Sequence, residues 1–250
     1  KNIVHRATRS RFYRNKFVQS SVSVRDINSP KDIQKLPVTT KQDLRDEYPD
    51  GLLARPVSDM VRLHASSGTT GSPTVIMHTQ NDLNTWADLV ARCMHMVGTR
   101  SGDVFQNMSG YGLFTGGLGI HYGAERLGCM TIPSGAGNSK RQIKLLTDFR
   151  VTVAHIIPSY ALHLATVFEN MGKSPRDTFL RSFLIGAEPH TEEIRQKVQE
   201  LYGVKAYNSY GLSEMNGPGV AFECEHQNGM HVWEDAYISE ILDPNTLEPV

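Results

Sequence analysis

Short apolar runs alternate along most of the chain with stretches in which apolar residues recur at helical spacing. Strands are predicted at residues 61–65, 74–79, 104–108, 129–132, 151–157 and 183–185, and a further strand runs into Tyr207. Helical periodicity covers residues 83–97, 141–149, 160–171 and 194–201. This alternation predicts an α/β fold in which a mostly parallel sheet is covered by helices on both faces.

Several helices carry a start signal that can be read from the sequence. Thr39 or Thr40 is expected to cap a short helix through residues 41–44. Thr79 and Asp82 have the spacing of a capping box, and Thr191 precedes the helix at 194–201. These hydroxyl side chains fix where the helices begin.

The amino end is basic, with six Lys or Arg residues among the first 16 and no acidic residue before Asp26. Such a start is compatible with a mitochondrial transit peptide. However, no small-residue cleavage pattern is present, and Phe12, Tyr13 and Phe17 recur as aromatic anchors. We therefore predict a helix whose aromatic residues pack on the domain while its arginines face water.

Composition limits the class of protein. The chain has 250 residues, 39% hydrophobic and 21% charged, which is enough to bury a core. Lys and Arg number 26, and so do Asp and Glu, so the formal net charge is zero. This balance gives no electrostatic reason to expect nucleic acid or a membrane as a partner, and no apolar run approaches the length of a bilayer span.

The three cysteines are far apart and form no Cys-x-x-Cys pair, which predicts reduced thiols and a cytoplasmic protein. Cys224, His226 and His231 offer zinc-type ligands, and a Zn²⁺ site is one interpretation of them. Their spacing matches no standard zinc finger, so a structural role without metal is the alternative.

Residues 66–74 read Ser-Ser-Gly-Thr-Thr-Gly-Ser-Pro-Thr. Glycines allow close backbone approach, and the hydroxyls between them add donors, so this segment can cradle an anion. It lacks the Gly-Lys-Ser/Thr ending of a P-loop and the spacing of a dinucleotide-binding turn. Taken alone, the segment is equally compatible with a flexible turn.

A second candidate segment, Tyr210-Gly-Leu-Ser-Glu214, follows a predicted strand. Ligands of parallel sheets lie outside the carboxyl ends of the strands. There an aromatic ring can stack on a purine, and a carboxylate can hold Mg²⁺ against phosphate oxygens. Asn208 can read the adenine edge, and residues 186–189 offer a backbone wall; in the alternative interpretation Glu214 only caps a turn.

Together these segments resemble the adenylate-forming superfamily of acyl-CoA synthetases and, within it, the phenylacetate–CoA ligase family. The narrower resemblance rests on Tyr111-Gly-Leu-Phe-Thr-Gly-Gly-Leu-Gly119 and Gly217-Pro-Gly-Val220. Further matching segments are Leu36-Pro37, Thr40-Lys41, Pro158-Ser-Tyr160, Gly186-Ala-Glu-Pro189, Glu223-Cys224 and Trp233-Glu-Asp235. The resemblance implies a large N-terminal adenylation domain that uses ATP, Mg²⁺, an aryl acid and coenzyme A.

The resemblance also implies roles for individual residues. Thr69 and Glu214 would be catalytic, and Glu214 would bind Mg²⁺. Nucleotide binding would fall to Ser66, Ser67, Gly68, Thr69, Thr70, Gly71, Ala187, Glu188, Pro189, Asn208, Tyr210, Gly211 and Ser213. The aryl pocket would be formed by Tyr111, Phe114, Gly116, Ala136, Pro158 and Gly186.

For some of these residues the alternative is structural. Tyr111 and Phe114 are also compatible with core packing, and Tyr160 is better explained as helix packing than as a ligand contact. His121 and His155 have no evident partner in the sequence, so we assign both to structural roles.

Two departures from the family pattern bear on activity. Ser72 stands where the phosphate loop usually carries a lysine, and no ribose-binding aspartate, hinge or small C-terminal domain follows residue 243. Residues 1–250 are therefore expected to be an AMP-binding domain that is incomplete at its C-terminal end. Alternatives are an aryl-acid adenylating enzyme that serves a carrier protein and a non-catalytic binding module; a homodimer is compatible with either.

Overall fold

The structure is a computed structural model that describes residues 2–66, 73–246 and 248–250. The chain divides into two compact units, residues 1–82 with 240–250 and residues 83–239. Within the described ranges, no helix is both long and apolar enough to cross a bilayer.

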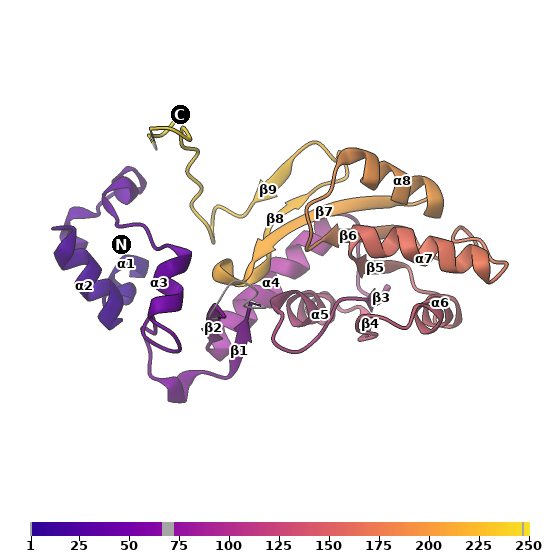
Figure 1. The fold of residues 1–250 in the computed structure, drawn as a ribbon, viewed down its shortest axis with the longest axis horizontal. Helices are drawn as coiled ribbons and strands as arrows, with labels where there is room; N and C mark the ends of the chain where they lie inside the picture. The colour runs from indigo at the N-terminus through magenta and orange to yellow at the C-terminus, as the bar shows by residue number, and fades with distance from the viewer. Residues whose placement is uncertain (1, 67–72, 247) are drawn as a thin grey trace. The chain divides into compact units, whose positions relative to one another are not determined.

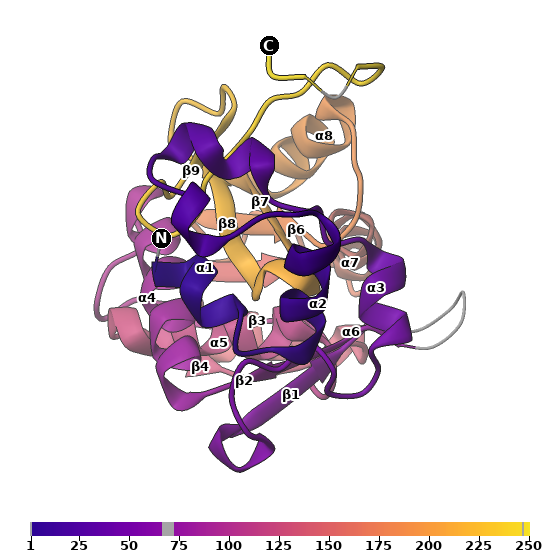
Figure 2. The same cartoon turned by 90° about the vertical axis from the view of Figure 1, so that its left-hand side faces the viewer.

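The smaller unit consists of short helices and one β-hairpin. Its elements are α1 (Asn2–Ala7), α2 (Arg11–Gln19), η1 (Val24–Asp26), η2 (Pro30–Lys35), α3 (Lys41–Asp46), η3 (Val57–Asp59), β1 (Arg62–Ala65) and β2 (Val75–His78). Strands β1 and β2 pair antiparallel, with Arg62 opposite His78 and Ala65 opposite Val75 (Figure 2). The two predicted strands are thus confirmed, but they form a separate sheet.

The aromatic residues near the amino end pack as predicted. Phe17 is buried, and the rings of Phe12 and Tyr13 meet edge to face with centroids 5.0 Å apart. Arg6 and Arg14 are exposed. The segment forms two helices, α1 and α2, separated at Ser10.

The larger unit contains a seven-stranded sheet (Figure 1). Its elements are α4 (Gln80–Met96, whose first turn belongs to the smaller unit), β3 (Val104–Asn107), α5 (Thr115–Leu127), β4 (Met130–Ile132), α6 (Ser139–Asp148), β5 (Val153–Ile156), α7 (Pro158–Asn170), β6 (Ser182–Gly186), α8 (Glu192–Tyr202), β7 (Lys205–Leu212), η4 (Ser213–Met215), β8 (Gly217–Glu223) and β9 (Met230–Val232). The strand order is β4-β3-β5-β6-β7-β8-β9. The first five strands are parallel and the last two antiparallel, which confirms the predicted mostly parallel sheet.

Both faces of this sheet are covered by helices, as predicted. Successive side chains of a strand point to opposite faces. Accordingly Ala154 and Phe183 join the apolar cluster formed with α6, α7 and α8. Val153 and Leu184 join the cluster formed with α4 and α5.

Helix α5 lies in the glycine-rich segment, to which the sequence analysis assigned no helix. A Cβ at Gly119 would lie 2.2 Å from Cζ2 of Trp86, and one at Gly123 would lie 2.2 Å from Cγ1 of Val90. The glycines therefore let α5 approach α4 more closely than any side chain would permit. This packing outweighs the low intrinsic helix propensity of glycine.

The predicted helix starts are confirmed. Of the two candidates, Thr40 is the N-cap of α3 and accepts a hydrogen bond from the backbone of Asp43. The Thr79 backbone N–H donates to Oδ2 of Asp82 at 2.9 Å, and the Asp82 N–H donates to Oγ1 of Thr79 at 3.3 Å. Thr191 occupies the N-cap position of α8, as predicted, but its side chain makes no capping hydrogen bond.

The segment that follows β9 is fastened to α4. Nε1 of Trp233 donates to Sγ of Cys93 at 3.2 Å, and Cys93 is fully buried. The Arg92 guanidinium lies 4.1 Å from the Trp233 ring centroid and forms a bidentate pair with Asp235, with distances of 2.8 and 3.2 Å. Burial raises the pKa of Cys93 to about 11.

Candidate functional site

Five neighbouring parallel strands deliver predicted site residues to one edge of the sheet. Ala136 follows β4, Tyr111 follows β3, Pro158 follows β5, Gly186 ends β6, and Tyr210 lies on β7 just before Glu214. These are the carboxyl ends of the strands, where α/β sheets bind their ligands. The predicted residues of the larger unit therefore converge on one edge.

The alternation of side chains along the strands determines which residues lie on each face of the sheet near this edge. The residues of β3, β5, β6 and β7 that pack towards α4 and α5 are Phe105, Val153, Leu184 and Tyr207. Two positions further on, the same strands carry Asn107, His155, Gly186 and Ser209. The strands thus change from apolar to polar or small residues on the face covered by α4 and α5.

The end of β6 is built for close approach of backbone. A Cβ at Gly186 would lie 2.6 Å from both the carbonyl oxygen and Oγ of Ser209. The next residue, Ala187, has φ 67°, in the left-handed region. A non-glycine residue there stores about 1–2 kcal/mol of strain, which is typical of functional sites.

Glu188 has a structural task that the sequence did not reveal. Its carboxylate accepts hydrogen bonds from the backbone N–H of Ser159 at 2.6 Å and from the Ser159 hydroxyl at 3.0 Å. Both donors lie in the first turn of α7, where a negative charge is favourable. The Glu188 side chain thus ties the end of β6 to the start of α7.

The segment Tyr210–Glu214 is accessible. The Tyr210 side chain is 51% exposed, and Glu214 is half-buried in η4. A Cβ at Gly211 would lie 2.1 Å from the carbonyl oxygen of Gly217, so only glycine fits beside β8. The Tyr210 ring is therefore available for stacking.

One hydrogen bond joins this segment to α5, and another joins the following strand β8 to α4. Oγ1 of Thr115 lies 3.1 Å from Oγ of Ser213, although the two residues are 98 positions apart. Nε1 of Trp86 donates to the carbonyl oxygen of Pro218 at 2.7 Å. The start of α5, in the candidate aryl segment, and the candidate nucleotide segment are thus in direct contact.

Tyr111 belongs to a polar network at the end of β3. Nδ2 of Asn107 donates to the Tyr111 hydroxyl at 3.0 Å, and that hydroxyl lies 3.2 Å from Nδ1 of His121. Nε2 of His121 lies 3.0 Å from Oε1 of Glu125. Burial raises the pKa of Tyr111 to about 12. Because it is partly buried and hydrogen-bonded on both sides, Tyr111 is held in one orientation.

A second network lies beside it. Oγ of Ser109 is 2.6 Å from Nδ1 of His155, which is buried at the end of β5. Desolvation lowers the pKa of His155 to about 4, so this imidazole is neutral at pH 7. His121 and His155 were predicted to be structural, with no evident partner. Ser109, the partner of His155, and Tyr111 lie on turns distant from these histidines in the sequence, whereas the i,i+4 spacing of His121 and Glu125 on α5 was a signal that could have been found.

The remaining aryl-pocket candidates are only partly brought together. A Cβ at Gly135, the neighbour of Ala136, would lie 3.9 Å from Cδ2 of Tyr111, so this loop adjoins the Tyr111 ring. The Phe114 ring covers Gly116, where a Cβ would lie 2.4 Å from Cε1 of Phe114, and Phe114 itself is 44% exposed. Core packing therefore does not account for Phe114.

No metal centre is preformed in the described part of the chain. Among those residues, no three His, Cys, Asp or Glu side chains are grouped so as to hold an ion. Cys224, His226 and His231 therefore do not form the zinc site that was one interpretation of their spacing. Mg²⁺ commonly takes only one or two carboxylates and completes its shell with water and phosphate oxygens, so Glu214 suits a nucleotide-bound Mg²⁺.

The predicted phosphate loop connects β1 to β2. The backbone N–H of Ser66 donates to the carbonyl oxygen of Thr74 at 2.9 Å, and the Thr74 N–H donates to Oγ of Ser66 at 3.0 Å. Ser67, Gly68, Thr69, Thr70, Gly71 and Ser72 lie outside the described residues. The pairing of this loop with Glu214 remains a prediction.

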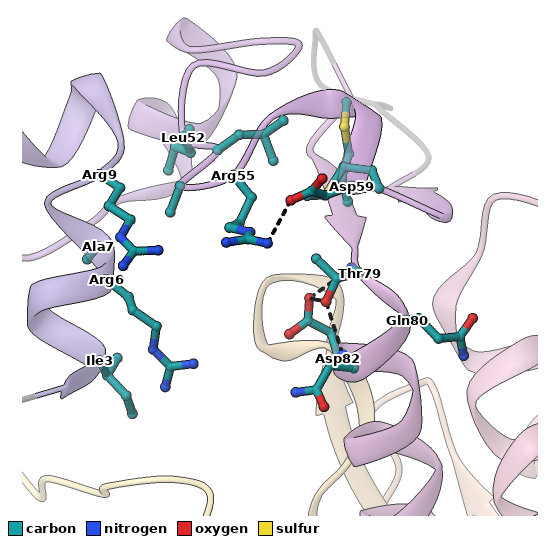
Figure 3. Close-up of a pocket in the computed structure, with 15 residues that line it drawn as sticks. Ile3, Arg6, Ala7, Arg9, Leu52, Arg55, Asp59, Thr79, Gln80 and Asp82 are labelled. Carbon is teal, nitrogen blue, oxygen red and sulfur yellow. Dashed lines mark hydrogen bonds and ion pairs between the residues drawn. The ribbon is translucent and has the colours of Figure 1, made fainter.

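The smaller unit contains a cavity of about 790 Å³. Arg6 and Arg9 of the amino-terminal segment lie on one side of it, and Arg55, paired with Asp59 at 2.8 Å, lies on the other (Figure 3). None of the predicted site residues lines this cavity. The candidate site therefore does not coincide with it.

The fold and the edge described above define a class of protein: an α/β domain with candidate ligand-binding residues at the carboxyl ends of parallel strands. Residues 14–250 match the AMP-binding enzyme family, and the chain belongs to that family. The predicted membership is thus confirmed.

Particular relatives narrow the resemblance. The chain is 49% identical over 237 residues to a phenylacetate-coenzyme A ligase of Pseudomonas putida, covering 94% of this chain and 54% of that protein. It is 48% identical over 240 residues to the protein of the same name from Thermus thermophilus, covering 96% and 54%. A crystal structure of 2-hydroxyisobutyryl-CoA ligase in complex with 2-HIB-AMP and CoA matches with a TM-score of 0.94 at 30% identity, covering 100% of this chain and 55% of that one. The chain spans about half the length of the relatives it matches.

Proposed function

We propose that the chain is part of the adenylation domain of an enzyme that activates an aryl acid resembling phenylacetate with ATP and transfers it to coenzyme A. One observation carries this proposal: five adjacent strands place the predicted residues on a single edge of the sheet. The identity of 48–49% to two proteins named phenylacetate-coenzyme A ligase supports the choice of acid.

In the proposed reaction, an oxygen of the acid attacks the α-phosphorus of ATP. A new P–O bond forms, the bond between the α-phosphorus and the bridging oxygen breaks, and pyrophosphate leaves. The sulfur of coenzyme A then attacks the acyl carbon, and AMP leaves. Both steps require positioning and charge neutralisation rather than a nucleophile of the enzyme.

The nucleotide is assigned to the edge near β6 and β7. Tyr210, exposed beside its glycine, would stack on adenine, with the backbone of residues 187–189 and the side chain of Asn208 around the ring. Glu214 would hold Mg²⁺, whose charge neutralises phosphate oxygens when bound. Residues 66–71, with Thr69 among them, are proposed to hold the β- and γ-phosphates.

The acid is assigned to the edge near β3 and β5. Tyr111, held by Asn107 and His121, would supply one wall, and Phe114 would supply another. Gly116 lets the Phe114 ring lie against the backbone of α5, and Gly186 lets β6 approach Ser209. Ala136 and Pro158 border the same edge. The contact of Thr115 with Ser213 would hold the acid-binding segment next to the nucleotide-binding segment.

Calorimetry on the chain tests the proposal. Titrations with ATP and Mg²⁺ and with phenylacetate should each give binding at one site. Glu214→Gln should weaken MgATP binding about tenfold, because it removes the charge that pairs with Mg²⁺. Glu193→Gln, an exposed carboxylate on α8, is the matched control and should leave the affinity unchanged.

Different results would support the alternatives. Binding of phenylacetate without MgATP would favour a non-catalytic module. If a longer form of the chain makes the adenylate but passes it to a phosphopantetheine carrier instead of free coenzyme A, the carrier-dependent enzyme is favoured. Absence of binding to both ligands would contradict the proposal.

We take residues 1–250 together as part of the adenylation domain. A cytoplasmic location, which the scattered cysteines favour, and a homodimeric state are further proposals. Light scattering on the purified chain distinguishes a monomer from a dimer.

A further inference from the structure

We propose that His121 is a positioning residue that sets substrate preference by withdrawing the hydrogen-bond donor of Tyr111 from the acid site. The inference rests on the proposed function, because it concerns the same acid-binding edge. It assigns to that edge a preference for acids whose aromatic ring carries no hydroxyl where the ring meets Tyr111.

Two hydrogen bonds fix the orientation of the Asn107 side chain. Nδ2 of Asn107 donates to the carbonyl oxygen of Gly117 at 2.7 Å, and Oδ1 accepts from the backbone N–H of Ser109 at 3.2 Å. A carbonyl oxygen only accepts and a backbone N–H only donates, so these two partners fix which end of the amide is which. The 3.0 Å contact with Tyr111 therefore comes from Nδ2, and the Tyr111 hydroxyl accepts it.

The tautomer of His121 determines where the hydroxyl hydrogen of Tyr111 points. Nε2 of His121 lies 3.0 Å from Oε1 of Glu125, and because a carboxylate only accepts, Nε2 carries a hydrogen. In the neutral ring Nδ1 is then bare and acts as an acceptor. It lies 3.2 Å from the Tyr111 hydroxyl, which donates its only hydrogen to it.

Burial and ring packing hold Asn107, Tyr111 and His121 in this arrangement. Asn107 is fully buried, and the His121 side chain is only 15% exposed. The rings of His121 and Tyr111 meet edge to face with centroids 5.8 Å apart. A ligand beside Tyr111 thus meets an aromatic ring and an oxygen that has no hydrogen left to donate.

A hydroxyl on the ligand that is buried against this oxygen still has a hydrogen to donate, but its own oxygen loses its bonds to water and accepts none from Tyr111. Burying an acceptor that has no donor is unfavourable, whereas an unsubstituted ring suffers no such loss. The arrangement therefore selects against a ring hydroxyl without any steric block.

The test compares calorimetric titrations with phenylacetate and 4-hydroxyphenylacetate, in the presence of Mg²⁺ and a non-hydrolysable ATP analogue. His121→Phe should raise the affinity for the hydroxylated acid relative to phenylacetate about fivefold, because Tyr111 regains a free hydrogen. His121→Asn should keep the wild-type ratio, since its Oδ1 stands where Nδ1 stood. Glu125→Ala, at a half-exposed position, should raise the ratio about twofold, because His121 is then no longer held in the tautomer that carries its hydrogen on Nε2.

The double variant Tyr111→Phe/His121→Phe separates this effect from a change of pocket shape. In the Tyr111→Phe background, His121→Phe should leave the ratio unmoved. An unchanged ratio in both folded variants, His121→Phe and Glu125→Ala, would overturn the inference, as would an equal rise without the Tyr111 hydroxyl. If the wild-type chain binds neither acid, the proposed function itself fails, and this inference falls with it.

Discussion

The face of the seven-stranded sheet beneath α6, α7 and α8 is packed with apolar side chains, among which lies the buried pair formed by Gln106 and Gln142. The face beneath α4 and α5 relies on glycines for close approach and becomes polar at the last residue of several strands. The first face stabilises the unit. The second face both packs the unit and presents the candidate site, so changes there should affect stability and binding together.

The largest effect is expected on the first face. Phe183 is fully buried and meets Tyr202 edge to face with centroids 4.8 Å apart. Phe183→Ala should lower the free energy of unfolding by about 3–5 kcal/mol and leave ligand affinity of the folded protein unchanged. Both tryptophans lie in the larger unit, so tryptophan fluorescence during urea unfolding measures this change. Phe179→Ala, at an exposed position, is the control and should cost under about 1 kcal/mol.

The next-largest effect is expected at low pH, from His155 at the polar end of the face beneath α4 and α5. The pKa of His155 is about 4 in the folded chain and about 6.5 when unfolded. Between these values the unfolded state binds more protons, so stability falls as the pH is lowered from 6.5 to 4, by about 3 kcal/mol from this group. His155→Asn keeps a hydrogen-bonding group for the Ser109 hydroxyl but cannot titrate.

Urea unfolding at pH 7 and at pH 4.5 measures this difference. The loss of stability between the two pH values should be smaller in His155→Asn than in the wild type. Equal losses in both proteins would show that His155 does not carry the effect.

A smaller effect is expected where α4 and α5 meet. Gly119→Ala places a Cβ against Trp86 and Pro218 and should cost about 1–3 kcal/mol. Because Trp86 holds the backbone of Pro218 near the nucleotide segment, MgATP affinity should fall as well. Gly110→Ala meets open space and should change stability by under about 0.5 kcal/mol. If MgATP binds Gly119→Ala normally, the coupling between packing and binding is refuted.

The smallest effect is expected for the hydrogen bond between Thr115 and Ser213. Thr115→Val keeps the shape of the side chain but removes the hydrogen bond to Ser213, at a cost of about 1 kcal/mol. Calorimetry should show weaker MgATP binding, by a few-fold. Thr115→Ser retains the hydroxyl and should behave like the wild type; if it binds as weakly as Thr115→Val, the methyl group and not the hydrogen bond is responsible.

Local signals in the sequence predicted much of the fold. Thr40 and Thr191 mark helix starts that the structure confirms, and apolar runs mark the parallel strands. Helix α5 escaped prediction because its glycines argue against a helix until α4 is placed beside them. Strands β8 and β9 were also missed, since β8 forms by pairing with β7, and β9 by pairing with β8, rather than from a pattern of their own.

The site was predicted as a set of segments but not as a set of contacts. Tyr111 and Glu214 could be found from motifs, and the structure confirms that their segments end on one edge of the sheet. The bonds of Tyr111 to Asn107 and of Thr115 to Ser213 depend on how distant segments pack. No local pattern encodes such a bond, so only three-dimensional packing reveals it.

The reactivity of the Cys93 thiol, which is buried beneath Trp233, can be used to measure opening of the Trp233–Asp235 segment. An alkylating reagent reaches this sulfur only after the Trp233–Asp235 segment lifts from α4 or the unit unfolds, and its raised pKa keeps the reactive thiolate scarce. Cys224 is only partly buried and reacts without such opening, so it supplies an internal reference. The ratio of the two alkylation rates, followed by mass spectrometry, therefore reports how often the segment detaches.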